Sequence, residues 1–144
     1  MAHILVAEDD PSSASVLQTV LKRAGYRVTV AVDGTATLRL LETNGPPDVL
    51  LLDWMLPDVS GLEICHQVRR RWDPLVLPVL MVTARADAES ISAAFDAGAS
   101  DYITKPYLGA ELRARVAAHL RTKRLIEEQR RMEEHLREQG KLSS

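Results

Sequence analysis

The chain has 144 residues, of which 46% are hydrophobic, so it is long enough for one domain with a substantial core and some chain to spare. Its formal net charge of −2 gives no overall electrostatic reason to bind nucleic acid or an anionic membrane, and we expect neither partner. A single cysteine excludes an intramolecular disulfide, and no charged leader with a long apolar run opens the chain, so we expect a cytoplasmic protein.

Five short apolar segments have the composition of β-strands, and they lie at residues 3–7, 27–31, 49–52, 78–82 and 101–104. The first, third and fourth are almost continuously apolar, which is typical of strands that are buried on both faces of a parallel sheet. Helix-period segments follow each strand. The alternation of strand and helix, five times over, predicts an α/β fold with a doubly wound, five-stranded parallel sheet.

The helices are predicted from capping residues and from apolar residues that recur every three to four positions. Four side chains are the predicted N-caps of the first four helices: Asp10, Asp33, Ser60 and Asp87. The first helix is expected to end at Gly25 and to bury Val16, Leu17, Val20, Leu21 and Ala24. One face of the fourth is expected to carry Ile91, Ala94, Phe95 and Gly98, and a fifth is marked by Leu112, Val116 and Leu120.

Polar side chains stand at the carboxyl ends of four predicted strands. Glu8 and Asp9 follow the first, Asp53 the third, Thr83 the fourth and Lys105 the fifth. Because these ends of parallel strands meet at one edge of a sheet, we expect the groups to converge. Crowded carboxylates repel one another unless a cation neutralises them, and their hard oxygen atoms suit Mg²⁺. Together with a lysine and a hydroxyl that can stabilise an anion, they predict phosphoryl transfer to Asp53.

Six motifs, in this order, resemble those of the response-regulator receiver family: Glu8-Asp9, Asp53, residues 56–61, Thr83-Ala84, residues 97–102 and Lys105-Pro106. The resemblance covers about residues 2 to 120. It implies a flavodoxin-like (βα)5 sandwich and a phosphoacceptor module of a two-component phosphorelay. The expected phosphoryl donor is a histidine kinase or a phosphotransfer protein. Such a module assists its own phosphotransfer and dephosphorylation and is not a turnover enzyme.

The resemblance also implies a role for each matching residue at the acidic site. Asp53 would be the phosphoacceptor. Mg²⁺ would be bound by Asp53, by Glu8 and Asp9, and by the backbone carbonyl of Met55. Lys105 would contact the oxygen atoms of the phosphoryl group.

Two further residues would form the switch of such a receiver. Thr83 would turn toward the phosphoryl group, and the ring of Tyr102 would move inward. The face formed by the fourth helix, the fifth strand and the fifth helix would then be remodelled.

Alternatives from other functional classes remain open at this point. The chain could be a haloacid-dehalogenase-like phosphohydrolase with Asp53 as its nucleophile, but such enzymes usually need a second acid two residues on, where this chain has Met55. It could also be a constitutive dimerisation adaptor. Finally, buried carboxylates near a lysine can form a purely structural ion-pair network.

Residues 1–120 are thus predicted to be the receiver domain, and residues 121–144 a helical extension that leads to an output domain not present in this chain. Seven residues of this region fit an alternating spacing of four and three: Ala118, Thr122, Leu125, Gln129, Met132, Leu136 and Gln139. They predict a weak coiled-coil seam, with a solvated single helix as the alternative. A homodimer would form through this seam, through the face from the fourth to the fifth helix, or through both.

Overall fold

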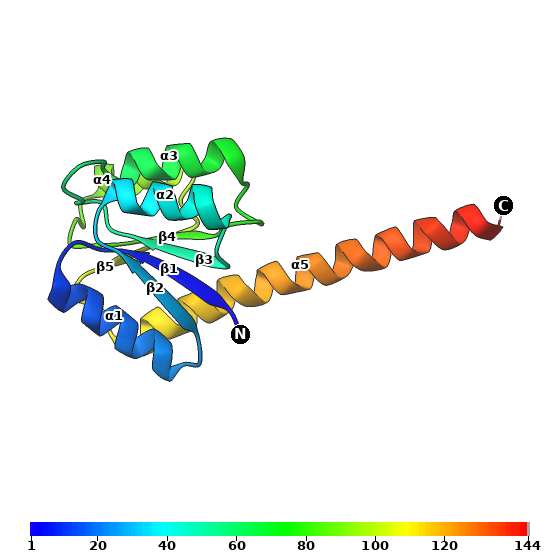
Figure 1. The fold of residues 1–144 in the computed structure, drawn as a ribbon, viewed down its shortest axis with the longest axis horizontal. Coiled ribbons are helices and arrows are strands. Elements are labelled where there is room, and N and C mark those ends of the chain that lie inside the picture. Colours follow the sequence, from blue (N-terminus) through cyan, green and yellow to red (C-terminus); the bar gives the residue numbers. More distant parts are fainter. Residues whose placement is uncertain (144) are drawn as a thin grey trace.

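The computed structural model describes the backbone of residues 1–143 and the side chains of residues 1–140 (Figure 1). Its five strands are β1 (His3–Ala7), β2 (Arg27–Ala31), β3 (Val49–Leu52), β4 (Val79–Thr83) and β5 (Asp101–Thr104). Its five helices are α1 (Pro11–Arg23), α2 (Gly34–Asn44), α3 (Gly61–Arg71), α4 (Ala88–Asp96) and α5 (Gly109–Ser143).

The strands form one parallel sheet in the order β2-β1-β3-β4-β5, which confirms the predicted doubly wound architecture. Four strands have the predicted bounds. The fourth begins and ends one residue later than predicted, at Val79 and Thr83, because Pro78 has no N–H to donate to a neighbouring strand. The chain reverses its direction of winding between β1 and β3, and ligands of such sheets bind at the strand ends beside this point.

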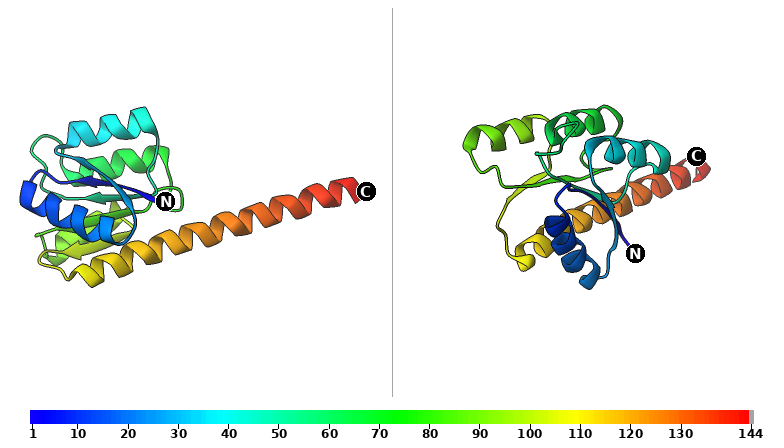
Figure 2. Two further views of the ribbon diagram at one scale, coloured as in Figure 1. Left: turned by 60° about the horizontal axis from the view of Figure 1, so that its bottom comes forward. Right: turned by 60° about the vertical axis from the view of Figure 1, so that its left-hand side comes forward.

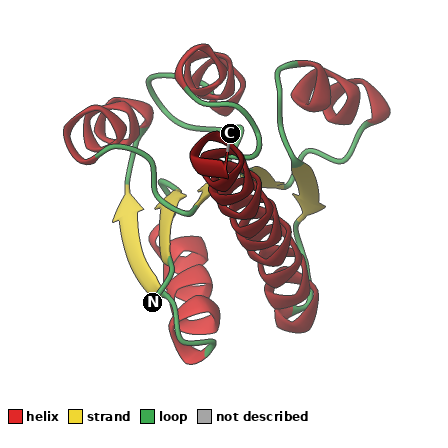
Figure 3. Cartoon of the chain, turned by 90° about the vertical axis from the view of Figure 1, so that its right-hand side faces the viewer, coloured by secondary structure: helices red, strands yellow, loops and turns green. Residues whose placement is uncertain are grey.

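Helices cover both faces of the sheet, as Figures 1 and 2 show. On one face α2, α3 and α4 pack over Leu50 and Leu52, and on the other α1 and α5 pack over Val49 and Leu51. The same two layers are seen from the end of α5 in Figure 3. Successive residues of β3 are therefore buried on opposite faces, which is why its sequence is continuously apolar.

All four predicted N-caps are confirmed, since each side chain accepts a hydrogen bond from a backbone N–H in the first turn of its helix. Two predicted apolar faces were partly wrong. The buried residues of α1 are Ala14, Leu17 and Leu21, whereas Val16 is 52% exposed because it lies on the far side of the helix, and Ala24 is exposed beyond the helix end. On α4, Phe95 is 46% exposed because the helix docks on the sheet through Ala94.

The longest helix, α5, continues without a break to Ser143. Its first turns bury Leu112 and Val116 against the sheet, and Leu120 packs at the edge of the same core. Beyond Lys123, which still contacts the body, the helix stands clear of it (Figures 1 and 2). Leu125, Met132 and Leu136 are each more than half exposed there, so the predicted coiled coil stays a prediction, and Ser144 lies outside the described residues.

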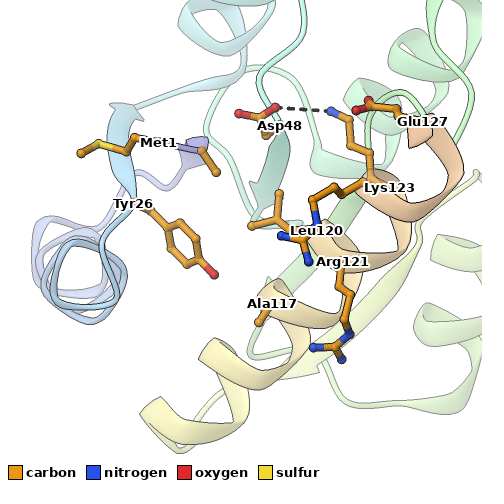
Figure 4. A pocket seen from close by; sticks show the side chains of 10 residues that line it. Met1, Tyr26, Asp48, Ala117, Leu120, Arg121, Lys123 and Glu127 are labelled. Carbon is orange, nitrogen blue, oxygen red and sulfur yellow. Dashed lines mark ion pairs between the residues drawn. The ribbon is translucent and has the colours of Figure 1, made fainter. Parts of the chain in front are cut away.

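An ion pair ties the root of this free segment to the body, at the sheet edge where the strands begin. Lys123 Nζ lies 3.5 Å from Asp48 Oδ1, and Asp48 also accepts a hydrogen bond from the backbone N–H of His3 at 2.7 Å. Figure 4 shows this ion pair beside a groove of about 510 Å³ between α5 and the side chains of Met1 and Tyr26. Among the described residues, no helix is both long and apolar enough to span a membrane.

Candidate functional site

The fold brings the polar groups of three strand ends together at one edge of the sheet. Glu8 and Asp9 follow β1, Asp53 follows β3, and one carboxylate oxygen of each lies within 4.8 Å of the others. Glu8 and Asp53 are buried, with exposed fractions of 2% and 7%, whereas Asp9 is exposed. The predicted convergence is therefore observed for Glu8, Asp9 and Asp53, and it extends to Lys105.

Lys105, which follows β5, lies against the two buried carboxylates. Its Nζ is 3.0 Å from Asp53 Oδ2 and also donates a hydrogen bond to Glu8. Burial raises the pKa of Glu8, and the nearby charge of Asp53 adds to this, although hydrogen bonding to Lys105 opposes it. Burial alone would lower the pKa of Lys105, but its bonds to Glu8 and Asp53 outweigh burial and raise that pKa.

The charges and donor atoms of this cluster fit a divalent cation. With the three carboxylates ionised, the single ammonium group of Lys105 leaves a net charge of −2. All the candidate ligand atoms are hard oxygens, which Mg²⁺ prefers, and the exposed position of Asp9 leaves one side open to water. Met55 places only its main chain toward the acceptor: its N–H donates to Asp53 Oδ1 at 3.0 Å, and its side chain is 60% exposed.

Close packing of main chain fixes the position of Asp53. Its N–H donates to the carbonyl of Ala7 on β1 at 3.0 Å, and the N–H of Gly61 donates to the carbonyl of Trp54 at 2.9 Å. A Cβ atom at Gly61 would lie 2.2 Å from the carbonyl oxygen of Asp53. Only glycine therefore lets α3 begin so close to the acceptor.

Thr83 and Tyr102, the predicted switch pair, are both buried and both contact Arg85. The Thr83 hydroxyl accepts the N–H of Arg85 at 3.4 Å, and the Tyr102 hydroxyl donates to the carbonyl of Arg85 at 2.7 Å. Tyr102 is 9% exposed, so its ring lies inward. Burial, assisted by the charge of Asp87, raises the pKa of Tyr102 and keeps its hydroxyl a neutral donor.

Sequence analysis missed two contacts near the acceptor. The guanidinium of Arg85 lies over the ring of Trp54, 4.7 Å from its centroid. Asp58 accepts hydrogen bonds from the N–H groups of Gly34, Thr35 and Val59 and from the hydroxyl of Thr35. Together these bonds hold the pKa of Asp58 well below its usual range, and the bond from the Thr35 hydroxyl has the largest effect. Both contacts cross between loops far apart in sequence, so no local pattern marks them.

Comparison with known proteins gives one consistent result. Residues 4–117 match the family described as the response regulator receiver domain. The chain is 41% identical over 119 residues to the transcriptional regulatory protein CseB of Streptomyces avermitilis, covering 83% of this chain and 49% of that protein. It is 42% identical over 121 residues to the sensory transduction protein RegX3 of Mycobacterium tuberculosis, covering 84% of this chain and 52% of that protein. It thus spans about half the length of these relatives.

Solved structures agree with the sequence relatives. The BeF3-activated N-terminal receiver domain of Klebsiella pneumoniae RstA superposes with a TM-score of 0.77 at 31% identity, covering 83% of this chain and 98% of that one. The BeF3-activated receiver domain of DrrB gives a TM-score of 0.76 at 35% identity and covers 84% and 98%.

Proposed function

Because the chain belongs to the response regulator receiver family, we propose that Asp53 is its phosphoacceptor in a two-component phosphorelay. The observation that supports this assignment best is the position of Asp53, a buried carboxylate held between an acidic pair and a lysine. Three carboxylates face one ammonium group, and this excess of negative charge favours a cation-binding site over a purely structural ion-pair network.

In the proposed reaction, a carboxylate oxygen of Asp53 forms a bond to phosphorus. The P–N bond to the imidazole of a donor histidine breaks, and its electron pair stays with the nitrogen. The N–H of Met55 holds one carboxylate oxygen of Asp53 in place, and Lys105 lies where it can stabilise charge on the transferred group.

Glu8, Asp9 and Asp53, with the backbone carbonyl of Met55, are the residues that we expect to hold Mg²⁺. The bound cation would supply charge neutralisation for both the carboxylates and the incoming phosphoryl group. As the resemblance to the receiver family implies, Glu8 would act through a bound water and Asp9 would be a direct ligand.

We expect Thr83 and Tyr102 to pass the phosphorylated state to the face of α4, β5 and α5. We place the receiver domain at residues 1–120 and a connection to an output domain at residues 121–144. The partners would be a histidine kinase or phosphotransfer protein, that output domain and, through α5 or the α4–β5–α5 face, a second copy. We also expect a cytoplasmic location, and no catalysis beyond the domain's own phosphotransfer and dephosphorylation.

The test uses acetyl phosphate with Mg²⁺ and the full chain. We expect one acid-labile phosphoryl group per chain in an intact-mass measurement, and none in Asp53→Asn. The control is Asp96→Asn, which changes an exposed acid on α4 and should be labelled as the native protein is. An Asp53→Asn chain that still gains the group, or a native chain that responds to neither acetyl phosphate nor beryllofluoride, would refute the assignment.

The rival functions are not favoured by the family match. A phosphohydrolase would need an acid at position 55, and Met55 offers none. A constitutive adaptor would not need the acidic cluster, Thr83 and Lys105 together.

A further inference from the structure

Arg85 makes a separate contact with each of three residues of the proposed site. Its guanidinium lies 4.7 Å from the ring centroid of Trp54, the residue that follows the acceptor. Its N–H donates to the hydroxyl of Thr83, and its carbonyl accepts from Tyr102 at 2.7 Å. The side chain thus contacts the acceptor loop, while the main chain contacts both switch residues.

The side-chain contact joins two loops that are far apart in the sequence. Trp54 lies between β3 and α3, and Arg85 between β4 and α4. Arg85 is exposed, and within the described part of the chain it forms no ion pair. Its guanidinium stacks on the ring of Trp54. Such stacking restrains a surface loop without burying a charge.

We propose that Arg85 is a positioning residue that holds Tyr102 in its inward position before a phosphoryl group arrives. The stack on Trp54 fixes the loop, and the loop holds the carbonyl that accepts from the Tyr102 hydroxyl. This inference rests on the proposed function, because the bias matters only if the inward state is the one that a phosphoryl group selects.

The expected effect is modest and measurable. An exposed cation–π contact shifts a two-state population by about two- to fivefold. The apparent affinity for a ligand falls in proportion to the fraction of the competent state. Loss of the stack should therefore raise the half-saturating beryllofluoride concentration by up to about the same factor.

The experiment labels the full chain with 3-fluorotyrosine and follows the fluorine NMR signal of Tyr102, assigned with Tyr102→Phe, during a beryllofluoride titration at saturating Mg²⁺. The variants are Arg85→Ala, Trp54→Leu and the double variant. Arg85→Ala keeps the backbone N–H and carbonyl but removes both the stack and the charge that acts on Asp87 and Tyr102, and the Trp54→Leu background separates the two effects. Arg71→Ala is the matched control, since it removes a similar stack on Trp72, 4.4 Å away, at the far end of α3.

We expect each single variant to raise the half-saturating concentration by up to about fivefold. The half-saturating concentration of the double variant should be no higher than that of either single variant, and that of Arg71→Ala should equal that of the native chain. Equal midpoints for Arg85→Ala and the native chain would overturn the inference, as would an Arg85→Ala effect that persists undiminished in the Trp54→Leu background. A native chain that binds no beryllofluoride, judged from the fluorine signal of the beryllofluoride itself, would instead overturn the proposed function, and the inference with it.

Discussion

At the scale of single residues, Lys105 and a bound divalent cation would both interact with the carboxylates of Glu8 and Asp53. The ammonium group contacts both Glu8 and Asp53, and these two acids are buried while the third is not. Lysine therefore neutralises part of the cluster when no metal is bound. Its own raised pKa means that it stays charged throughout the neutral range.

Lys105→Met should make the protein less stable without metal and more responsive to Mg²⁺. Removing one partner of a buried pair leaves the carboxylates uncompensated, at a cost of about 1–3 kcal/mol for a lysine that is partly exposed. Thermal unfolding with and without Mg²⁺ measures both effects. Lys123→Met, which removes the ion pair with Asp48 at the opposite sheet edge, should show the native response to Mg²⁺. If Mg²⁺ raised the Tm of both variants by the same amount, this would contradict a competition between Lys105 and Mg²⁺ for the carboxylates.

Gly61→Ala should destabilise the fold and displace the acceptor. Its Cβ would meet the main chain of Asp53 at 2.2 Å and of Trp54 at 2.8 Å, and main chain cannot rotate aside as a side chain can. We expect a loss of about 1–3 kcal/mol in denaturant unfolding, together with slower labelling by acetyl phosphate. Gly109→Ala is the control, because the nearest atom to its Cβ is a Val20 methyl at 3.6 Å. Unchanged labelling in Gly61→Ala would show that the acceptor tolerates the shift.

At the scale of elements, β5 and α5 are joined by charge as well as by packing. Asp101, the first residue of β5, pairs with Arg115 at 2.8 Å and with His119 at 3.1 Å. Burial acts to raise the pKa of Asp101, but the N–H of Tyr102 and the two α5 side chains outweigh it, and the pKa is lowered. The strand that carries Tyr102 is thereby tied to the helix that leaves the domain.

The lowered pKa of Asp101 predicts a stability difference that depends on pH. A carboxyl group whose pKa is lower in the folded state stabilises the fold above its unfolded pKa of about 3.9, and the contribution is lost as the pH falls through the folded value. Asp101→Asn should thus be about 1 kcal/mol less stable at pH 7. The gap should close as the pH falls through the lowered pKa of Asp101 in the folded state. Chemical unfolding across this range tests it, with the exposed Asp96→Asn as control, and a gap that stays constant with pH would contradict it.

The elements that sequence analysis predicted well are those that depend on local signals. Asp10, Asp33, Ser60 and Asp87 cap helices a few residues away, and the apolar run 49–52 needs no knowledge of its neighbours. The side of α1 that faces the sheet depends on docking, so the prediction for Val16 was wrong. The convergence of Asp53 with Glu8 followed from strand order, but the stack of Arg85 on Trp54 depends on how two loops fold back, which no spacing encodes.

At the scale of the whole molecule, α5 presents an unpartnered row of apolar side chains. Leu125, Met132 and Leu136 are exposed, and they occupy core positions of the predicted seam. If two chains pair through this row, the resulting dimer holds two receiver domains together.

Light scattering of the full chain should give the mass of a dimer, and the triple variant L125E/M132E/L136E should give a monomer. Charged residues at these positions would be buried against each other in a coiled coil but cost little on a solvated helix. The variant should keep normal labelling of Asp53, because none of the three residues is near the acidic cluster. A native chain that is monomeric at all concentrations would favour the single solvated helix.

The unbroken course of α5 gives the molecule the properties of a lever arm. The 23 helical residues after Leu120 rise about 1.5 Å each, so the described helix extends about 35 Å beyond Leu120. A tilt of about 5° at the root would move the far end by about 3 Å. The ion pair of Lys123 with Asp48 lies at the point about which the helix would tilt. Small movements of β5 that tilt α5 would therefore displace the far end of the helix, which lies too far from Asp53 for any direct contact.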